Sequence, residues 1–157
     1  MSGARTEACR ALQEWGVGMD DYLVFKRLCS PDADEIRMAV FTVRDYTLQN
    51  DILCMEGMYE QLFQRLSVGF SVGEMQRYED VLAEKFPKKI LAWYVRGVSR
   101  MAEPVGGRKC YAEMADILFW MRRYAGGDEE VNRLLAGWRA VYTHRPAMWD
   151  EFRKRGL

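Results

Sequence analysis

The sequence predicts an all-α fold, either a helical bundle or a short stack of antiparallel helix pairs, with about seven to eight helices. Apolar residues recur at three- and four-residue steps along most of the chain, which is the spacing of one helix face. Prolines, glycine pairs and capping residues separate the segments that show this spacing. The linkers between these segments are short, and short linkers favour antiparallel neighbours.

The composition is that of a folded chain outside the membrane. The 157 residues suit a single domain, 1–157, with a possible subdivision into 1–70 and 71–157. Hydrophobic residues make up 49% of the chain and charged residues 29%, as in globular proteins. No window approaches the roughly 18 consecutive apolar residues of a membrane span, and residues 1–11 lack the apolar run of a secretory signal. The scattered cysteines (Cys9, Cys29, Cys54 and Cys110) predict reduced thiols and a cytoplasmic location.

Two stripes predict helices near the start of the chain. The first consists of Ala8, Leu12 and Trp15, and Gly16 can end it. The second consists of Ile36, Ala39, Val40 and Val43, after a cap, a first-turn proline and early negative charge in residues 30–35. Because residues 38–43 are rich in β-branched and aromatic types, a strand over 38–48 is the alternative to the expected helix.

A third stripe predicts one helix over residues 51–66. Its members are Ile52, Met55, Tyr59, Leu62, Phe63 and Leu66. Gly57 interrupts this stripe at a cost of about 1 kcal/mol relative to alanine. We expect packing to offset the cost, so that the helix continues through the glycine.

Helix signals are strongest from Ser71 onward. Residues 71–74 form a capping box, in which the serine and glutamate side chains satisfy backbone donors. The stripe that follows contains Met75, Tyr78, Val81, Leu82 and Phe86. Pro87 can end this helix and open the next. The next stripe contains Ile90, Leu91, Tyr94, Val95 and Val98, before Pro104 and the glycine pair at 106–107 end it.

Two longer helices and a short one complete the prediction. A helix over 108–124 is apolar around its whole circumference at residues 117–121, so we expect neighbours on opposite sides of it. Asp128 is the expected N-cap of the following helix. The stripe of that helix contains Val131, Leu134, Leu135, Trp138, Val141 and Tyr142. Pro146 opens a final helix through Met148, Trp149 and Phe152.

The patterns of common active sites are absent from the sequence. His144 is the single histidine, and its place between two predicted helices is explained by the helix C-terminus. No serine elbow, phosphate-binding loop or H-E-x-x-H helix occurs. The acidic pairs Asp20–Asp21, Asp32 with Asp34, and Glu129–Glu130 fall at predicted helix starts, where negative charge is stabilising. We therefore expect no enzyme, no cofactor and no metal site, and an enzyme whose acidic residues meet only in three dimensions is a third hypothesis.

Basic residues gather between positions 85 and 109. They are Lys85, Lys88, Lys89, Arg96, Arg100, Arg108 and Lys109, and only Glu103 opposes them. This segment can neutralise phosphates, so a nucleic-acid-associated accessory domain is one functional hypothesis. The 23 basic and 23 acidic side chains of the whole chain cancel, which weighs against it.

Trp93, Arg96 and Arg100 share a flank of their predicted helix, away from its apolar stripe. An aromatic side chain beside arginines is typical of a partner-binding surface, to which Trp149 would contribute. The alternative is a solvated face with Trp93 packed against the next helix. The leading hypothesis is a non-catalytic helical interaction or scaffold module that binds a protein partner or self-associates.

The second half of the chain contains three short patterns. They are Phe86-Pro87-x-x-Ile90-Leu91, then Arg108-x-x-Tyr111, and finally Trp138 leading to Tyr142-x-x-Arg145-Pro146-Ala147-Met148. In these the chain resembles the C-terminal helical region of bacterial SWIM zinc-finger proteins. The resemblance implies an all-helical, non-catalytic module associated with DNA-linked or complex-forming proteins. The finger's own C-x-C and C-x-H ligands are absent, so zinc binding is not implied.

Overall fold

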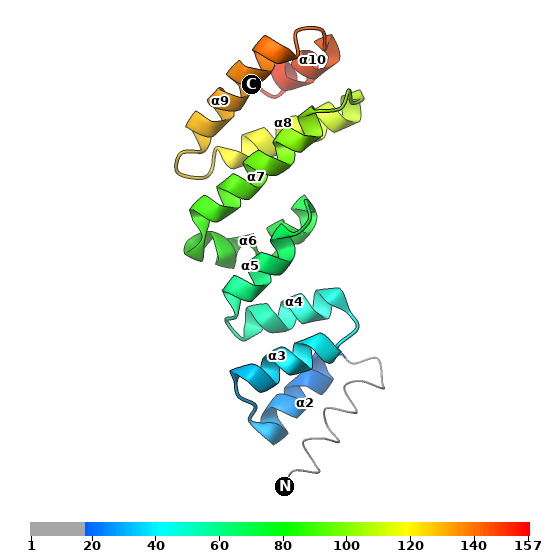
Figure 1. Ribbon diagram of the computed structural model, residues 1–157, viewed down its shortest axis with the longest axis vertical. Helices are drawn as coiled ribbons and strands as arrows, with labels where there is room; N and C mark the ends of the chain where they lie inside the picture. The colour runs from blue at the N-terminus through cyan, green and yellow to red at the C-terminus, as the bar shows by residue number, and fades with distance from the viewer. Residues whose placement is uncertain (1–17) are drawn as a thin grey trace. The chain divides into compact units, whose positions relative to one another are not determined.

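The computed structural model describes residues 18–157, and every regular element in that range is an α-helix (Figure 1). The described helices are α2 (Met19–Cys29), α3 (Ala33–Thr42), α4 (Tyr46–Met55), α5 (Tyr59–Ser67), α6 (Val72–Lys85), α7 (Pro87–Ala102), α8 (Arg108–Met121), α9 (Gly127–Val141) and α10 (Pro146–Lys154). The predicted all-α class is confirmed, and nine helices in the described range is close to the number expected. The expected helix that ends at Gly16, and Cys9 with it, lies outside the described residues.

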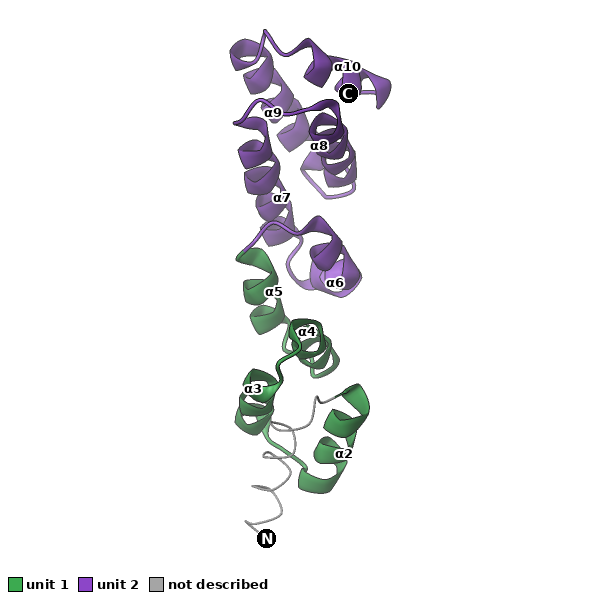
Figure 2. Cartoon of the chain, turned by 90° about the vertical axis from the view of Figure 1, so that its right-hand side faces the viewer, with its two compact units in different colours: residues 1–68 green, residues 69–157 purple. Residues whose placement is uncertain are grey.

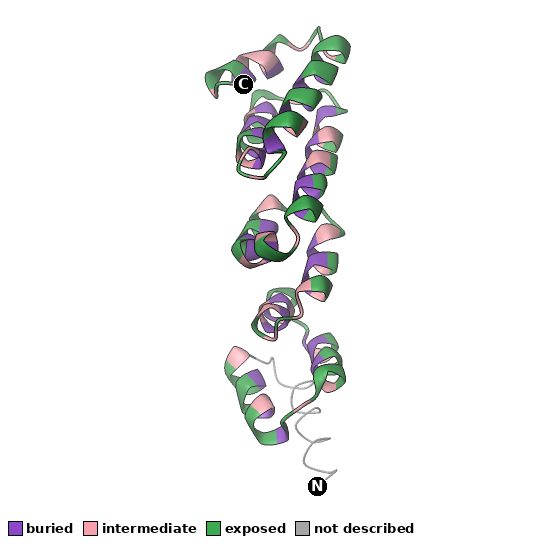
Figure 3. Ribbon diagram, turned by 90° about the vertical axis from the view of Figure 1, so that its left-hand side faces the viewer, coloured by how far each residue is buried: buried purple, intermediate pink, exposed green. Residues whose placement is uncertain are grey.

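The chain forms two compact units, Met1–Val68 and Gly69–Leu157 (Figure 2). In the described range, unit 1 contains α2 to α5 and unit 2 contains α6 to α10. Most helices bury one face and expose the other, as the colours of Figure 3 show. This pattern is the structural form of the three- and four-residue apolar spacing in the sequence.

In unit 1, α3 packs on α4 and α4 packs on α5. The buried apolar side chains of these three helices and their linkers are Ile36, Ala39, Val40, Val43, Leu48, Ile52, Leu53, Leu62, Phe63 and Leu66. Asp32 caps α3 by accepting hydrogen bonds from the backbone N–H groups of Asp34 and Glu35. The Glu35 carboxylate in turn accepts from the N–H of Asp32, which completes a capping box. Residues 38–48 are therefore not a strand: they are the end of α3, a short linker and the start of α4.

The prediction of one continuous helix over 51–66 is wrong, because α4 ends at Met55 and α5 begins at Tyr59. Gly57 has φ of 68°, in the left-handed region that glycine adopts without a Cβ clash. The N–H of Met58 donates to Leu53 O and the N–H of Gly57 donates to Cys54 O. These two bonds are a Schellman motif, so Gly57 is a helix terminator and not a tolerated interior residue.

In unit 2, α8 packs against α7, α9 and α10, and α6 packs against α7. The fully buried side chains include Met75, Leu82, Ile90, Tyr94, Val98, Met114, Leu118, Met121, Val131 and Met148. The start of α9 lies directly on the end of α8. A Cβ atom at Gly127 would lie 1.9 Å from Met121 O, so only glycine fits at this contact.

Four details of unit 2 differ from the sequence prediction. Ser71 is the N-cap of α6, but its side chain makes no capping hydrogen bond, so the predicted capping box is wrong. Asp128 lies in the first turn of α9, and the N-cap is Gly126 in a left-handed conformation. Phe119 is 60% exposed, so α8 is not covered around its whole circumference. Val141 is also exposed, which ends the buried stripe of α9 at Trp138.

Arg145 joins the α9–α10 linker to the end of α7. Its guanidinium donates to the carbonyl oxygens of Ala102, Glu103 (3.0 Å) and Pro104 (3.1 Å). The same group lies 3.9 Å from the ring centroid of Tyr142. Carbonyl groups at a helix C-terminus have no partner within the helix, so Arg145 supplies donors that α7 lacks.

Candidate functional site

The prediction that Trp93 lies on an exposed flank of α7 is wrong. Trp93 is 2% exposed, and its indole N–H donates to Gly69 O at 3.0 Å. The Phe70 and Tyr94 rings lie 4.6 and 4.9 Å from the Trp93 ring, measured between centroids. Trp93 is therefore part of the core, as in the packed alternative, and its indole packs on the segment before α6. It contributes no surface to a partner.

The seven basic residues of the 85–109 segment are all exposed. Lys88, Arg96 and Arg100 follow one another at multiples of four residues, so they share a face of α7. Lys89 lies 4.8 Å from the Phe86 ring centroid, and Arg108 pairs with Asp150 and Glu151. In the described part of the chain, Lys85, Lys88, Arg96, Arg100 and Lys109 form no ion pair with a carboxylate. The structure thus presents a basic stripe on α7 with its charge uncompensated.

Trp149 is half-buried at a second basic place, between α9 and α10. Its indole N–H donates to Tyr142 O at 3.0 Å, and the guanidinium of Arg139 lies 5.6 Å from its ring centroid. Trp149, Arg139, Arg153 and Leu157 line a hollow of about 280 Å³. The expected arrangement of an aromatic beside arginines therefore exists at Trp149, and not at Trp93.

Unit 1 contains an apolar groove that the sequence did not reveal, the α3–α5 groove, with a volume of about 320 Å³. Its apolar residues are Val40, Phe41, Leu53 and Val68, and its polar residues are Arg37, Gln61, Gln64 and Arg65. Phe41 is 75% exposed and Val68 is 89% exposed. The sequence hardly indicates this groove. Phe41 lies beside the core stripe of its helix, so the sequence pattern makes it look like an isolated surface residue.

Arg65 is held in place at the α3–α5 groove. Its guanidinium donates to Asn50 at 3.1 Å and to the side chain of Gln49, and it lies 4.7 Å from the Tyr46 ring centroid. These partners are neutral. Within the described residues Arg65 pairs with no carboxylate, so its positive charge is free to meet an acidic group of a ligand.

Unit 2 contains a buried carboxylate, Glu79, which is 5% exposed. The indole N–H of Trp120 donates to both of its oxygens at 3.0 Å. The hydroxyl of Tyr94 donates at 3.2 Å, and the hydroxyl of Tyr124 also donates to it. Three neutral donors from α7, α8 and the turn after α8 thus replace the water that burial removes.

Burial and the neighbouring Glu79 carboxylate raise the pKa of Tyr94 and the pKa of Tyr124 well above the ordinary phenol value. Both phenols therefore remain neutral donors across the physiological range. Glu79 could have been suspected from the sequence, because it falls inside the apolar stripe of Met75, Tyr78 and Leu82.

Two hollows border this cluster. The larger, the α6–α8 pocket, has a volume of about 420 Å³ and is lined by Phe70, Gln76, Tyr94, Glu113, Asp116 and Trp120 among others. The smaller has a volume of about 250 Å³ and is lined by Glu79, Asp80, Pro87, Trp120, Arg123 and Tyr124 among others. Trp120 lines both, and its position is fixed by the bond to Glu79.

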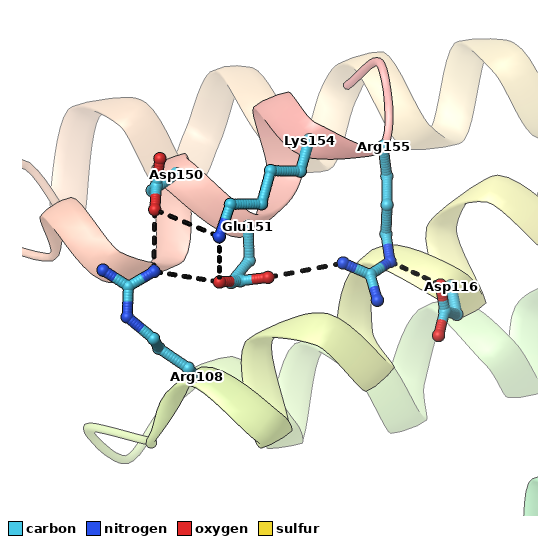
Figure 4. A network of polar contacts seen from close by, with 6 residues as sticks. All are labelled: Arg108, Asp116, Asp150, Glu151, Lys154 and Arg155. Atoms are coloured by element: carbon cyan, nitrogen blue, oxygen red, sulfur yellow. Dashed lines mark hydrogen bonds and ion pairs between the residues drawn. The ribbon is translucent and has the colours of Figure 1, made fainter.

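A polar network joins α8 to α10 (Figure 4). Arg108 donates to Asp150 at 2.7 Å and to Glu151 at 2.9 Å, and Lys154 donates to Glu151 at 2.9 Å. Arg155 bridges Glu151 (3.4 Å) and Asp116 (2.6 Å). Hydrogen bonds from these cations lower the pKa of the Asp150 and Glu151 carboxyls. Arg108 therefore has a structural role, because it links α8 to α10 in this network.

The residues considered for catalysis or metal binding lie in separate elements of the described chain. His144 is exposed in the α9–α10 linker. No group of three or more His, Cys, Asp or Glu side chains in residues 18–157 is placed to hold a metal ion. Cys29, Cys54 and Cys110 are not joined by disulfides. Asp20 and Asp21, Asp34, and Glu129 and Glu130 lie in the first turns of α2, α3 and α9.

The residues of the three short patterns in the second half make internal contacts. Arg108 pairs with α10, the Tyr111 hydroxyl accepts from the N–H of Gly106 at 3.0 Å, and Arg145 caps α7. None of the helices α2 to α10 is long and apolar enough to cross a membrane. Comparisons with protein-family models, characterised proteins and solved structures found no significant match. The resemblance to the SWIM region therefore stays a prediction.

Proposed function

We propose that the chain is a non-catalytic helical interaction module, and that the α3–α5 groove of unit 1 binds an amphipathic helix of a protein partner. The observation that carries the proposal is the exposure of Phe41 and Val68 beside an apolar floor of Val40 and Leu53. Apolar surface in contact with water costs about 25 cal/mol per Å², and a partner that covers it recovers this free energy. The proposal includes a location in the reducing cytoplasm, which suits thiols such as those of Cys54 and Cys110 that form no disulfide.

Charge limits the kind of helix that fits. Arg65 is fixed at the groove by neutral partners, so a carboxylate on the incoming helix gains a new ion pair there. Arg37 already pairs with Asp34 and contributes less. We therefore expect a helix with apolar residues at i, i+3, i+4 and i+7 and an acidic residue at one edge.

A displayed library of amphipathic helical peptides, selected against the full chain, tests the proposal. Peptides that bind should lose at least about tenfold in affinity for the Phe41→Ser variant, since an exposed aromatic anchor contributes about 1.4 kcal/mol or more. Phe119→Ser is the matched control, because Phe119 is exposed on α8 of unit 2. Binding that Phe41→Ser leaves unchanged would contradict the proposal. A dimer in light scattering that Phe41→Ser dissociates would instead identify a second copy as the occupant.

The exposed stripe on α7 favours a nucleic-acid-associated accessory domain as a second candidate. Lys88, Arg96 and Arg100 form no ion pair with a carboxylate in the described range, which is the state in which they can neutralise phosphates. Fluorescence anisotropy with a labelled oligonucleotide should show binding that weakens steeply as salt rises. Arg96→Glu with Arg100→Glu should abolish it, whereas Arg27→Glu with Arg44→Glu, exposed residues of unit 1, should have a smaller effect. Unchanged oligonucleotide binding by the Arg96→Glu and Arg100→Glu double variant would exclude this candidate.

A further inference from the structure

The α6–α8 pocket of unit 2 combines aromatic walls with an acidic rim. Phe70, Tyr94 and Trp120 supply the rings, and Glu113 and Asp116 supply the carboxylates. No lysine, arginine or histidine is among its lining residues in the described chain. Its volume of about 420 Å³ lies within the range of small-ligand sites. We propose that this pocket binds an organic cation, either a guanidinium or an alkylammonium group.

The acidic residues of the pocket are placed by the helical repeat of α8. Glu113, Asp116 and Trp120 are separated by three and four residues, so they lie on one face of this helix. Arg155 pairs with one oxygen of Asp116 at 2.6 Å, whereas Glu113 is exposed and pairs with no cation in the described chain. Glu113 therefore supplies the charge that is available to a ligand.

Trp120 supplies the ring against which a cation can lie. Its N–H donates to the Glu79 carboxylate at 3.0 Å, so the indole is fixed before any ligand arrives. The ring already accepts one cation: the guanidinium of Arg123 lies 3.9 Å from its centroid. Tryptophan is the preferred aromatic partner of such groups, and Trp120 also lines the α6–α8 pocket.

The pocket is held in shape by bonds that a ligand does not need to form. Tyr94 and Trp120 both donate to Glu79, and Phe70 packs at 4.6 Å from the buried Trp93 ring, measured between centroids. A site fixed in this way loses little side-chain entropy on binding. This inference is independent of the groove proposal, because every residue it uses belongs to unit 2.

The test is a titration followed by the Trp120 indole N–H signal in a ¹⁵N-correlation NMR spectrum, assigned with Trp120→Phe. One probe is the peptide acetyl-Gly-Arg-Gly-amide and the other is agmatine, a small molecule that carries both a guanidinium and an alkylammonium group. The control peptide replaces arginine by citrulline, which keeps the shape and removes the charge. We expect a saturable shift with the cationic probes, with a Kd in the range of about 0.1 to 10 mM, and no shift with the citrulline peptide.

Two variants assign the binding to the pocket. Glu113→Gln removes an exposed charge without disturbing the fold, and we expect it to weaken binding at least about fivefold. Glu129→Gln removes an exposed charge on α9 outside the pocket and should change nothing. Binding of the peptide alone would identify an arginine side chain as the ligand, and binding of agmatine as well would identify a free organic cation. A shift that fails to saturate, that the citrulline peptide reproduces, or that Glu113→Gln leaves unaltered would overturn the proposal.

Discussion

At the scale of single residues, Glu79 shows how a carboxyl group is accommodated inside a helical core. Its oxygens accept from Tyr94, Trp120 and Tyr124, so the removal of the carboxylate deprives one buried and two part-buried donors of this acceptor. Each such donor costs about 1 kcal/mol or more. We expect Glu79→Ala to lower the free energy of unfolding by about 3 kcal/mol in chemical denaturation.

The matched control for Glu79 is Glu84→Ala, an exposed position on the same helix. Surface changes of this kind stay within about 0.5 kcal/mol. If the two variants were equally stable, the hydrogen bonds to Glu79 would contribute nothing net to folding.

For two glycines inside helices, we expect substitution by alanine to have opposite effects on stability. A Cβ atom at Gly97 in α7 would lie 1.9 Å from the Phe70 ring, so Gly97→Ala must displace that ring. We expect a loss of about 1 to 3 kcal/mol. Gly137 in α9 has no neighbour within 4 Å of the same position, and Gly137→Ala should stabilise by about 1 kcal/mol through helix propensity. Thermal unfolding of both variants checks the pair, and a stabilising Gly97→Ala would contradict the contact.

Residues differ in how far the sequence could place them. The stripes of α6 to α9 predicted buried side chains such as Met75, Leu82 and Ile90, because packing follows the helical repeat. The prediction of an exposed Trp93 is wrong because its side chain is buried by Gly69 and Phe70, which lie more than 20 residues earlier in the chain. No helical repeat encodes a contact of that kind. The partners of Glu79 also come from three separate places, so its role could only be read from the structure.

At the scale of elements, Gly57 shows where a stripe is ambiguous. Apolar residues keep helical spacing on both sides of it, and the spacing alone cannot tell a glycine within a helix from one that ends it. The Schellman bonds of Met58 and Gly57 settle the matter in the structure. The cap at Asp32 could be predicted from the sequence because a capping box needs only local residues. The contact of the linker residue Arg145 with the end of α7 could not, because it spans more than 40 residues.

The contact between α8 and α10 should make the stability of the fold depend on pH. The pKa of Glu151 is lowered by hydrogen bonds from Lys154 and Arg108. A carboxyl whose pKa is lower in the folded state stabilises the fold above its unfolded pKa, near 4.5, and that stabilisation is lost as the pH falls through the folded value. We expect Glu151→Gln to lower the urea midpoint at about pH 7.

At about pH 3 the two proteins should differ less in stability than at about pH 7, because the stabilisation from Glu151 declines as the pH falls below the unfolded pKa of the carboxyl. Glu129→Gln, which changes an exposed carboxylate outside the network, should follow the wild-type profile. A constant difference between wild type and Glu151→Gln at both pH values would show that packing, and not charge, accounts for the effect.

At the scale of the whole molecule, the position of the division between the units has a measurable consequence. A subdivision at 70/71 was expected from the helix start at Ser71, and the two compact units divide between Val68 and Gly69. The difference is two residues, and both are bound to unit 2. Gly69 O accepts from Trp93, and the Phe70 ring packs on Trp93 and Gly97.

We therefore expect a fragment 69–157 to unfold cooperatively, and a fragment 71–157 to be less stable by about 2 kcal/mol, because it loses the Phe70 ring and the acceptor of the Trp93 indole N–H. Urea denaturation followed by tryptophan fluorescence measures the difference. The fragment 69–157 with Phe70→Ala separates the two losses: its stability should lie close to that of 71–157, since the ring contributes more than the single hydrogen bond. Equal stability of 69–157 and 71–157 would mean that unit 2 is complete without Gly69 and Phe70, and that these residues are a linker whose contacts with Trp93 do not stabilise the fold.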